Sequence, residues 1–407
     1  MLLRHKRLLA VTVSTLVGLA IATAAWKLRP EGATVETHDN REEYEGLIEK
    51  RTQGEASVAT MASPGGSEAA RALDEPLRRG PIPEKDARVL FSALRQGGKR
   101  TIYDPQAYYW EASSFRSPKT FAEHPSGSWN VRTNDMGFRK SVDVLQEKPD
   151  LRIIATGDSH TAGVIPNREQ FVNALERLLE EVAPTKSIEG LNAGKGAYSF
   201  YNYVGALEKV LPLEPDVFVM AVFGGNDFFE CVRVYRYFNQ LRSAPKAPGF
   251  KRKTFESLRE ESRKLFAQGM NQIGTFREFP IYREYGLVVA RRSATAVREI
   301  CDENGIRLVC VYIPPCADAQ PHLIRDQLDR VIEGMAWTES DVHDTDRIAD
   351  EYLGFLEESG IAAIDMRDIY RQSSKACYWM TDLHINTEGH RLIAVALAEE
   401  LRALLGG

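Results

Sequence analysis

The chain has 407 residues, of which 43% are hydrophobic and 27% are charged, and its formal net charge at pH 7 is -5. This length allows one large domain with a tether and an insertion, and it is ample for a buried core. The nearly balanced charge gives no reason to expect nucleic acid as a partner.

A short basic segment at the amino terminus precedes an uncharged run of 19 residues, Leu8 to Trp26. Such a run behind a basic flank is about long enough to span a bilayer as a helix. We therefore expect residues 1–26 to be a signal anchor that holds an extracytoplasmic catalytic domain at a membrane. Ala22 to Ala24 also fits a cleavage signal, so a removed signal peptide and a secreted or periplasmic protein remain the alternative.

The next segment, residues 27–85, is polar, mixed in charge and locally rich in Gly, Ser, Pro and Ala. This composition predicts a flexible tether. Residues 86–150 are expected to form a lead-in segment that packs on the following domain.

Five short apolar runs then alternate with helical patterns, and their Val, Ile and Leu content is typical of buried parallel strands. These runs are Arg152 to Thr156, Ser187 to Leu191, Val217 to Phe223, Leu308 to Ile313 and Ile361 to Ile364. The alternation predicts a three-layer α/β/α domain over residues 151–407 with a mostly parallel five-stranded sheet.

Residues 228–286 form a long helical and aromatic insertion after the third predicted strand. Because pockets on such sheets are built from loops at the strand ends, the insertion is a candidate cap over a substrate site. Simple helix packing is the alternative interpretation.

Four short blocks carry the chemistry of the chain, and each lies at a predicted strand end or helix start. They are Gly157-Asp158-Ser159 with Thr161, Asn192 to Tyr198, Gly224-Gly225-Asn226-Asp227, and Asp382-Leu383-His384. The first block would place Ser159 in a strand-to-helix turn at the carboxyl edge of the sheet, where a nucleophile is exposed.

In this order, the blocks resemble those of the SGNH, or GDSL-type, serine hydrolase superfamily over about residues 130–405. The upstream segment Asn134 to Arg139 also resembles the lead-in of many exported members. The resemblance implies a flavodoxin-like SGNH fold, a serine nucleophile and ester hydrolysis without a cofactor.

A serine hydroxyl needs a base within hydrogen-bond reach, and His384 is the candidate because imidazole titrates near neutrality. A carboxylate on the other ring nitrogen would orient the imidazole, and we assign this role to Asp382. The resembled family usually places this acid three residues before the histidine, where this chain has Thr381. Related envelope acyl-transfer enzymes show the two-residue spacing.

By resemblance, the oxyanion hole combines the backbone N–H of Ser159, a backbone N–H of Gly196 or Ala197, and the amide of Asn226. Alanine stands at the position of the usual family glycine, so the choice between Gly196 and Ala197 stays open. Structural support for the turns is expected from Gly157, Asp158 and Gly224.

The expected function is therefore that of an exported esterase that hydrolyses an acyl ester of an envelope glycan, a lipid or a small alcohol. An envelope polysaccharide O-acyltransferase and a non-catalytic envelope binding or scaffold protein are the alternatives. The membrane, through the N-terminal helix, and the ester are the expected partners.

The eight histidines and five cysteines show no paired ligand spacing, so we predict neither a metal nor another cofactor. One or two disulfides would suit an oxidising compartment, whereas the apolar surroundings of Cys310 predict a buried free thiol.

Overall fold

The computed structural model describes residues 75–96, 98–241 and 265–405. The predicted signal anchor at 1–26, most of the tether and residues 242–264 of the insertion lie outside this part of the chain. Among the helices within it, none is both long enough and apolar enough to cross a membrane.

A five-stranded, fully parallel sheet forms the centre of the domain, with the strand order β6-β5-β7-β8-β9. Its strands are β5 Leu151–Gly157, β6 Ile188–Asn192, β7 Val217–Phe223, β8 Arg307–Ile313 and β9 Ala362–Asp365. Every residue of β5, β6 and β7 is buried, and β7 is apolar throughout, as expected of a strand covered on both faces. The predicted α/β fold is confirmed, and the strand ends agree with the prediction to within one residue.

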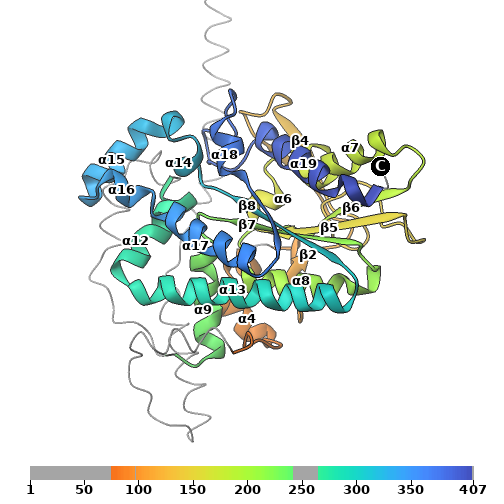
Figure 1. Ribbon diagram of the computed structural model, residues 1–407, viewed down its shortest axis with the longest axis horizontal. Helices are drawn as coiled ribbons and strands as arrows, with labels where there is room; N and C mark the ends of the chain where they lie inside the picture. Colours follow the sequence, from red (N-terminus) through yellow and green to blue (C-terminus); the bar gives the residue numbers. More distant parts are fainter. Residues whose placement is uncertain (1–74, 97, 242–264, 406–407) are drawn as a thin grey trace, which may run out of the picture. The chain divides into compact units, whose positions relative to one another are not determined.

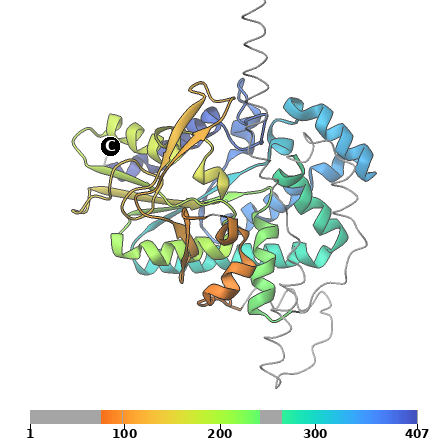
Figure 2. The same ribbon diagram turned by 180° about the vertical axis from the view of Figure 1, so that it is seen from behind.

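Helices cover both faces of the sheet, as alternate residues of one strand show. Phe218, Met220 and Val222 of β7 belong to one apolar core, whereas Val219 and Ala221 belong to the other. The first core is completed by the helices α8 Phe200–Val210, α9 Asp227–Phe238, α13 Pro280–Glu303 and α17 Asp344–Glu358. The second is completed by α7 Phe171–Val182, α14 Cys316–Ala319, α15 Arg325–Met335, α18 Met366–Arg371 and α19 Thr387–Leu401. Figures 1 and 2 show α8 and α13 on one side of the sheet and α7 and α19 on the other.

The segment before the sheet contributes two short helices and two antiparallel hairpins. These elements are α4 Glu84–Leu90, α5 Ser92–Gln96, β1 Thr101–Asp104, β2 Tyr108–Glu111, β3 Arg116–Thr120 and β4 Ser128–Arg132. Leu90, Phe91, Tyr109 and Trp110 are buried in the first core, together with residues of the sheet. The segment therefore shares its apolar packing with the sheet domain.

Several short elements complete the described chain: α6 Ser159–Ala162, η1 Asn167–Glu169, η2 Leu211–Leu213, η3 Phe266–Met270, α12 Asn271–Glu278, η4 Pro321–Ile324, α16 Glu339–Val342 and η5 Arg402–Leu405. All five cysteines are buried free thiols, so the suggested disulfides are absent and the prediction for Cys310 is confirmed. Burial raises the pKa of the Cys310 thiol to about 12, which keeps it protonated at neutral pH.

Candidate active site

Ser159 begins helix α6 directly after strand β5, at the carboxyl edge of the sheet. Asp158 is the N-cap of this helix, and its Oδ1 accepts the backbone N–H of His160 at 2.8 Å. A side chain at Gly157 would place its Cβ 2.0 Å from Thr161 Oγ1, so the turn requires glycine there. The turn thus presents Ser159 at the point where a parallel sheet opens to ligands.

The structure brings His384 and Asp382 to Ser159 from a loop that precedes α19. His384 Nε2 lies 2.9 Å from Ser159 Oγ, and His384 Nδ1 lies 3.2 Å from Asp382 Oδ2. Asp382 Oδ1 also accepts the backbone N–H of His384 at 3.1 Å. Burial acts to raise the pKa of Asp382, but the contacts with His384 outweigh it and lower the pKa, so this carboxyl is ionised at neutral pH.

The residue between the acid and the base explains how a two-residue spacing works. Leu383 is buried and has a φ of 58°, in the left-handed region. Its N–H donates to Trp379 O at 2.9 Å, and Trp379 N–H donates to His384 O at 2.9 Å. This tight turn brings the side chains of Asp382 and His384 into contact. In an extended chain, the two side chains would point to the same face but lie farther apart.

A second histidine, His160, packs next to the ring of the base His384. The His160 ring stacks on Phe223 with a centroid distance of 3.7 Å and lies 4.7 Å from the His384 ring. Its Nδ1 accepts the N–H of Ile385 at 3.3 Å, and its Nε2 lies 3.2 Å from Gln268 Oε1. Burial, and then the nearby charge of His384, lower the pKa of His160 well below the usual value. His160 therefore packs and stays uncharged beside the base.

Gln268 is a residue of the predicted insertion that sequence reasoning did not single out. It belongs to η3, and its contact with His160 places this part of the insertion next to the site. The insertion therefore reaches the site, although only its residues 228–241 and 265–286 belong to the described chain. Its function as a cap stays a prediction.

The second sequence block forms a loop beside the nucleophile. A Cβ at Gly196 would lie 3.9 Å from Ser159 Cβ, and Ala197 adopts a left-handed φ of 61°. Lys195 N–H donates to Gly157 O at 3.0 Å, which ties this loop to the end of β5. Gly196 thus lies next to the nucleophile, and the oxyanion role of Gly196 or Ala197 stays a prediction.

Asn226 follows strand β7, which is adjacent to β5, so both strands end at the same edge of the sheet. It is the N-cap residue of α9, and its Oδ1 is buried without a hydrogen-bond partner among the described residues. A Cβ at Gly224 would lie 1.9 Å from Tyr312 Oη, so the β7 turn also requires glycine. The role of Asn226 in the oxyanion hole stays a prediction.

The lead-in segment supports the oxyanion loop through residues that carried no sequence motif. Tyr109 Oη donates to Gly196 O at 3.1 Å, and Glu111 Oε2 lies 2.9 Å from Lys195 Nζ. Arg100 also binds Glu111 through two nitrogens. Burial lowers the pKa of Lys195 to about 8, against the opposing effect of Glu111. Strand β2 therefore helps to fix the loop next to Ser159.

Two buried carboxyl groups lie behind the nucleophile. Asp158 Oδ2 lies 3.3 Å from Ser159 Oγ, and burial raises the pKa of Asp158 to about 6. Asp227 Oδ2 accepts hydrogen bonds from Tyr203 Oη at 2.6 Å and from Phe223 N at 2.8 Å. Burial, followed by the charge of Asp158, raises the pKa of Asp227 well above its usual value. Asp158 and Asp227 thus disfavour each other's ionisation.

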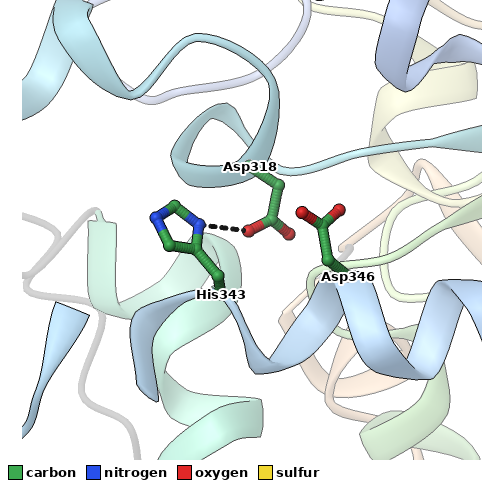
Figure 3. A group of neighbouring side chains, drawn as sticks. All are labelled: Asp318, His343 and Asp346. Carbon is green, nitrogen blue, oxygen red and sulfur yellow. Dashed lines mark hydrogen bonds and ion pairs between the residues drawn. The ribbon is translucent and has the colours of Figure 1, made fainter. Parts of the chain in front are cut away.

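A group of possible metal ligands lies elsewhere, on α14 and at the start of α17 (Figure 3). Its members Asp318, His343 and Asp346 have ligand atoms within 4.8 Å of one another. His343 Nδ1 is 3.0 Å from Asp318 Oδ1, while Asp346 Oδ2 is 2.9 Å from the guanidinium of Arg371. Arg367 also contacts Asp346, at 3.3 Å. Since arginines already neutralise Asp346, we interpret this group as an ion-pair network that joins the helices.

No family model and no curated protein matches the chain. Among solved structures, it is similar to a lipase/acylhydrolase from Enterococcus faecalis, with 14% identity over 62% of this chain and 96% of that chain, and a TM-score of 0.36. It is also similar to an acetyl xylan esterase from Geobacillus stearothermophilus, with 13% identity over 62% and 94% of the two chains, and a TM-score of 0.37. An esterase from Pseudoalteromonas sp. aligns at 13% identity over 63% and 99%, with a TM-score of 0.34. At these values, the activity of the chain must be inferred from its own residues.

Proposed function

We propose that the chain is an SGNH-type serine esterase that cleaves an oxygen ester through an acyl-serine intermediate. The observation that carries this proposal is the 2.9 Å contact between Ser159 Oγ and His384 Nε2. Asp382, which is 3.2 Å from the other ring nitrogen, supplies the negative charge that a protonated imidazole requires.

In the proposed reaction, Ser159 Oγ attacks the ester carbonyl carbon while its proton passes to His384 Nε2. The tetrahedral intermediate then collapses, and His384 gives the proton to the departing alcohol oxygen, which leaves an acyl group on Ser159. A water molecule next attacks the acyl carbonyl while His384 takes its proton. Collapse of the second intermediate returns this proton to Ser159 Oγ and releases the carboxylic acid.

The negative charge on the tetrahedral oxygen needs donors that are in place before the reaction. The N–H groups of Ser159 and of Gly196 or Ala197 suit this role, since the second-block loop lies beside the nucleophile. We assign the third donor to the Asn226 amide. Loss of one donor of this kind typically lowers turnover by about 100- to 1000-fold.

The proposed setting is outside the cytoplasm, with an ester of an envelope glycan, a lipid or a small alcohol as substrate. The uncharged run from Leu8 to Trp26 behind a basic flank supports export. Met380 and Thr381, which precede the candidate acid in the chain, are exposed to solvent.

The test is turnover of a short-chain chromogenic acetyl ester by the full-length protein, beside the variants Ser159→Ala and His384→Ala. We expect both variants to lose nearly all activity, because Ser159→Ala removes the nucleophile and His384→Ala removes its base. A fluorophosphonate should label Ser159 in the wild-type protein, as mass spectrometry of the labelled peptide would show.

His322→Ala is a matched control, because His322 is an exposed histidine outside the site. It should retain wild-type turnover. Equal activity of the wild-type and Ser159→Ala proteins would refute the esterase proposal, while ester consumption that depends on a glycan acceptor would instead indicate acyl transfer.

A further inference from the structure

Glu123 lies in the turn between strands β3 and β4, far from Ser159 in the sequence and outside every predicted motif. The turn is closed by backbone hydrogen bonds from Phe121 N to Gly127 O at 2.9 Å and from Gly127 N to His124 O at 2.8 Å. Strands β3 and β4 pair in antiparallel register from Arg116 opposite Arg132 to Thr120 opposite Ser128. Glu123 is therefore held at the tip of a defined hairpin.

The Glu123 carboxylate accepts two consecutive backbone N–H groups immediately before the candidate catalytic acid. Oε2 accepts from Met380 N at 2.6 Å, and Oε1 accepts from Thr381 N. The next residue in the chain is Asp382. One carboxylate thus fixes two successive peptide groups that lead into the acid, and charge strengthens both hydrogen bonds.

Aromatic contacts hold the hairpin tip against the same loop. The Phe121 ring lies 5.4 Å from the Trp379 ring, and the His124 ring lies 5.9 Å from it, both in edge-to-face arrangements. The backbone N–H of Trp379 in turn donates to the backbone oxygen of His384. The tip therefore contacts the residues that precede the acid and close the turn around Leu383.

Glu169 of η1 links the hairpin to the helix that follows the base. His124 Nε2 lies 2.9 Å from Glu169 Oε2, and the same oxygen lies 3.1 Å from Thr387 Oγ1, at the start of α19. Burial raises the pKa of Asp382, but the contacts with His384, and after them the charge of Lys119 in strand β3, lower it below its usual value. The hairpin thus contacts the residues before the acid directly and is linked to the start of α19 through Glu169.

We propose that Glu123 is a positioning residue that holds the segment Trp379 to Asp382, so that Asp382 stays in contact with His384. This inference rests on the proposed esterase function. Met380 and Thr381 are exposed, so their N–H groups can bind water when the carboxylate is removed. The loss of Glu123 should therefore act mainly on the geometry of the acid–base pair and only slightly on folding.

The test compares Glu123→Ala and Glu123→Gln with the full-length wild-type protein on the chromogenic acetyl ester. A displacement of about 1 Å in a catalytic group can cost about 100-fold in rate. We expect Glu123→Ala to lower kcat by about 10- to 100-fold with little change in KM. Glu123→Gln should lose less, because its amide oxygen still accepts one of the two N–H groups.

Ser126→Ala is the matched control within the same turn. Ser126 Oγ contacts His124 Nδ1 at 2.7 Å and donates to Ser128 O at 3.2 Å, and none of its side-chain hydrogen bonds in the described chain reaches residues 379–384. This variant should weaken the hairpin while kcat stays within about twofold of the wild-type value. A comparable loss of kcat in Ser126→Ala would show that hairpin stability, rather than the Glu123 carboxylate, matters.

A double-mutant cycle with Asp382→Ala separates positioning from a general structural effect. If Glu123 acts through Asp382, adding Glu123→Ala to Asp382→Ala should change kcat by less than about twofold. Independent, multiplicative losses would overturn the proposal, as would a lowered melting temperature with unchanged kcat.

The esterase function and the positioning role of Glu123 can be tested separately. If Ser159→Ala leaves ester turnover unchanged, the proposed function is wrong. If turnover depends on Ser159 and Asp382 but Glu123→Ala retains the wild-type kcat, the function stands and the positioning role is wrong. NMR spectra of histidine-labelled protein at one fixed pH add a readout without substrate, in which Glu123→Ala should move the His384 ring resonances and Ser126→Ala should not.

Discussion

Glu111 and Lys195 form a buried ion pair, with Oε2 2.9 Å from Nζ, that joins strand β2 to the loop beside Ser159. Their side chains are only 4% and 7% exposed, so neither charge can be solvated when its partner is lost. Tyr109, two residues earlier on the same strand, donates to Gly196 O. One strand of the lead-in segment thus supports two consecutive residues of the candidate oxyanion loop.

Replacement of Glu111 should therefore be costly. Glu111→Gln leaves Lys195 without its buried counter-charge, and a broken buried pair typically costs about 3–5 kcal/mol of unfolding free energy. The double variant Glu111→Gln with Lys195→Met should be more stable than Glu111→Gln alone, because it removes the unpaired charge. Chemical denaturation of the three proteins measures this. A Glu111→Gln variant within about 1 kcal/mol of wild type would contradict the argument.

The two-residue spacing of the acid and the base can be tested with Asp382→Asn. The amide keeps the shape of the side chain but removes the charge that stabilises an imidazolium, so kcat on the acetyl ester should fall by about 1000- to 10,000-fold. Asp150→Asn is the control. Asp150 is an exposed aspartate just before β5, and it accepts a hydrogen bond from the backbone N–H of Ser187. A loss below about tenfold in Asp382→Asn would remove Asp382 from the proposed mechanism.

The left-handed conformation of Ala197 makes a specific prediction for the oxyanion loop. Ala197→Gly should keep kcat within a few-fold, because the backbone N–H remains and glycine adopts a positive φ without strain. Ala197→Val should lower the unfolding free energy by more than about 1 kcal/mol and also reduce kcat, because a β-branched residue is strained at this φ. Equal behaviour of the two variants in denaturation and turnover would show that this conformation does not matter.

His390 should make the fold sensitive to acid. Burial, followed by the charge of Arg139, lowers the pKa of His390 to about 3. The unfolded chain takes up a proton near pH 6.5 and the folded chain only near pH 3, so this residue reduces stability as the pH falls between these values. The slope is at most about 1.4 kcal/mol per pH unit for one proton.

The measurement for His390 is the unfolding free energy of the wild-type protein and His390→Gln at several pH values from 7 to 4. The variant lacks the titrating ring, so its stability should decline less over this range. Parallel pH profiles for the two proteins would show that His390 does not contribute.

Most of the central sheet could be predicted because strands β5, β6 and β7 are buried along their whole length. Every residue of Val217–Phe223 is apolar and buried. Glycines also mark two strand ends, since β5 ends at Gly157 and β7 is followed by Gly224 and Gly225. The hairpin β3–β4 gave no comparable signal. Most residues of β3 are exposed, and Pro118 stands within the strand, so its sequence lacks the alternation that identifies a half-buried strand.

The supporting residues of the site escaped prediction for another reason. Glu123 and Gln268 are single polar residues whose partners come from distant parts of the chain, and no local spacing marks such pairs. The acid was assigned to Asp382 by its type and neighbourhood, but the left-handed Leu383 that brings it to His384 becomes visible only in the structure. The catalytic roles themselves stay predictions until turnover is measured.

His384 follows Ser159 by 225 residues, and the two meet only when the loop before α19 docks at the sheet edge. During synthesis from the amino end, the serine and its turn leave the ribosome long before the histidine does. A partly made chain therefore carries a serine hydroxyl without a base, which is a weak nucleophile. Under the proposed mechanism, full reactivity arises only when the domain is complete, so unfinished chains should attack esters far more slowly than the folded protein does.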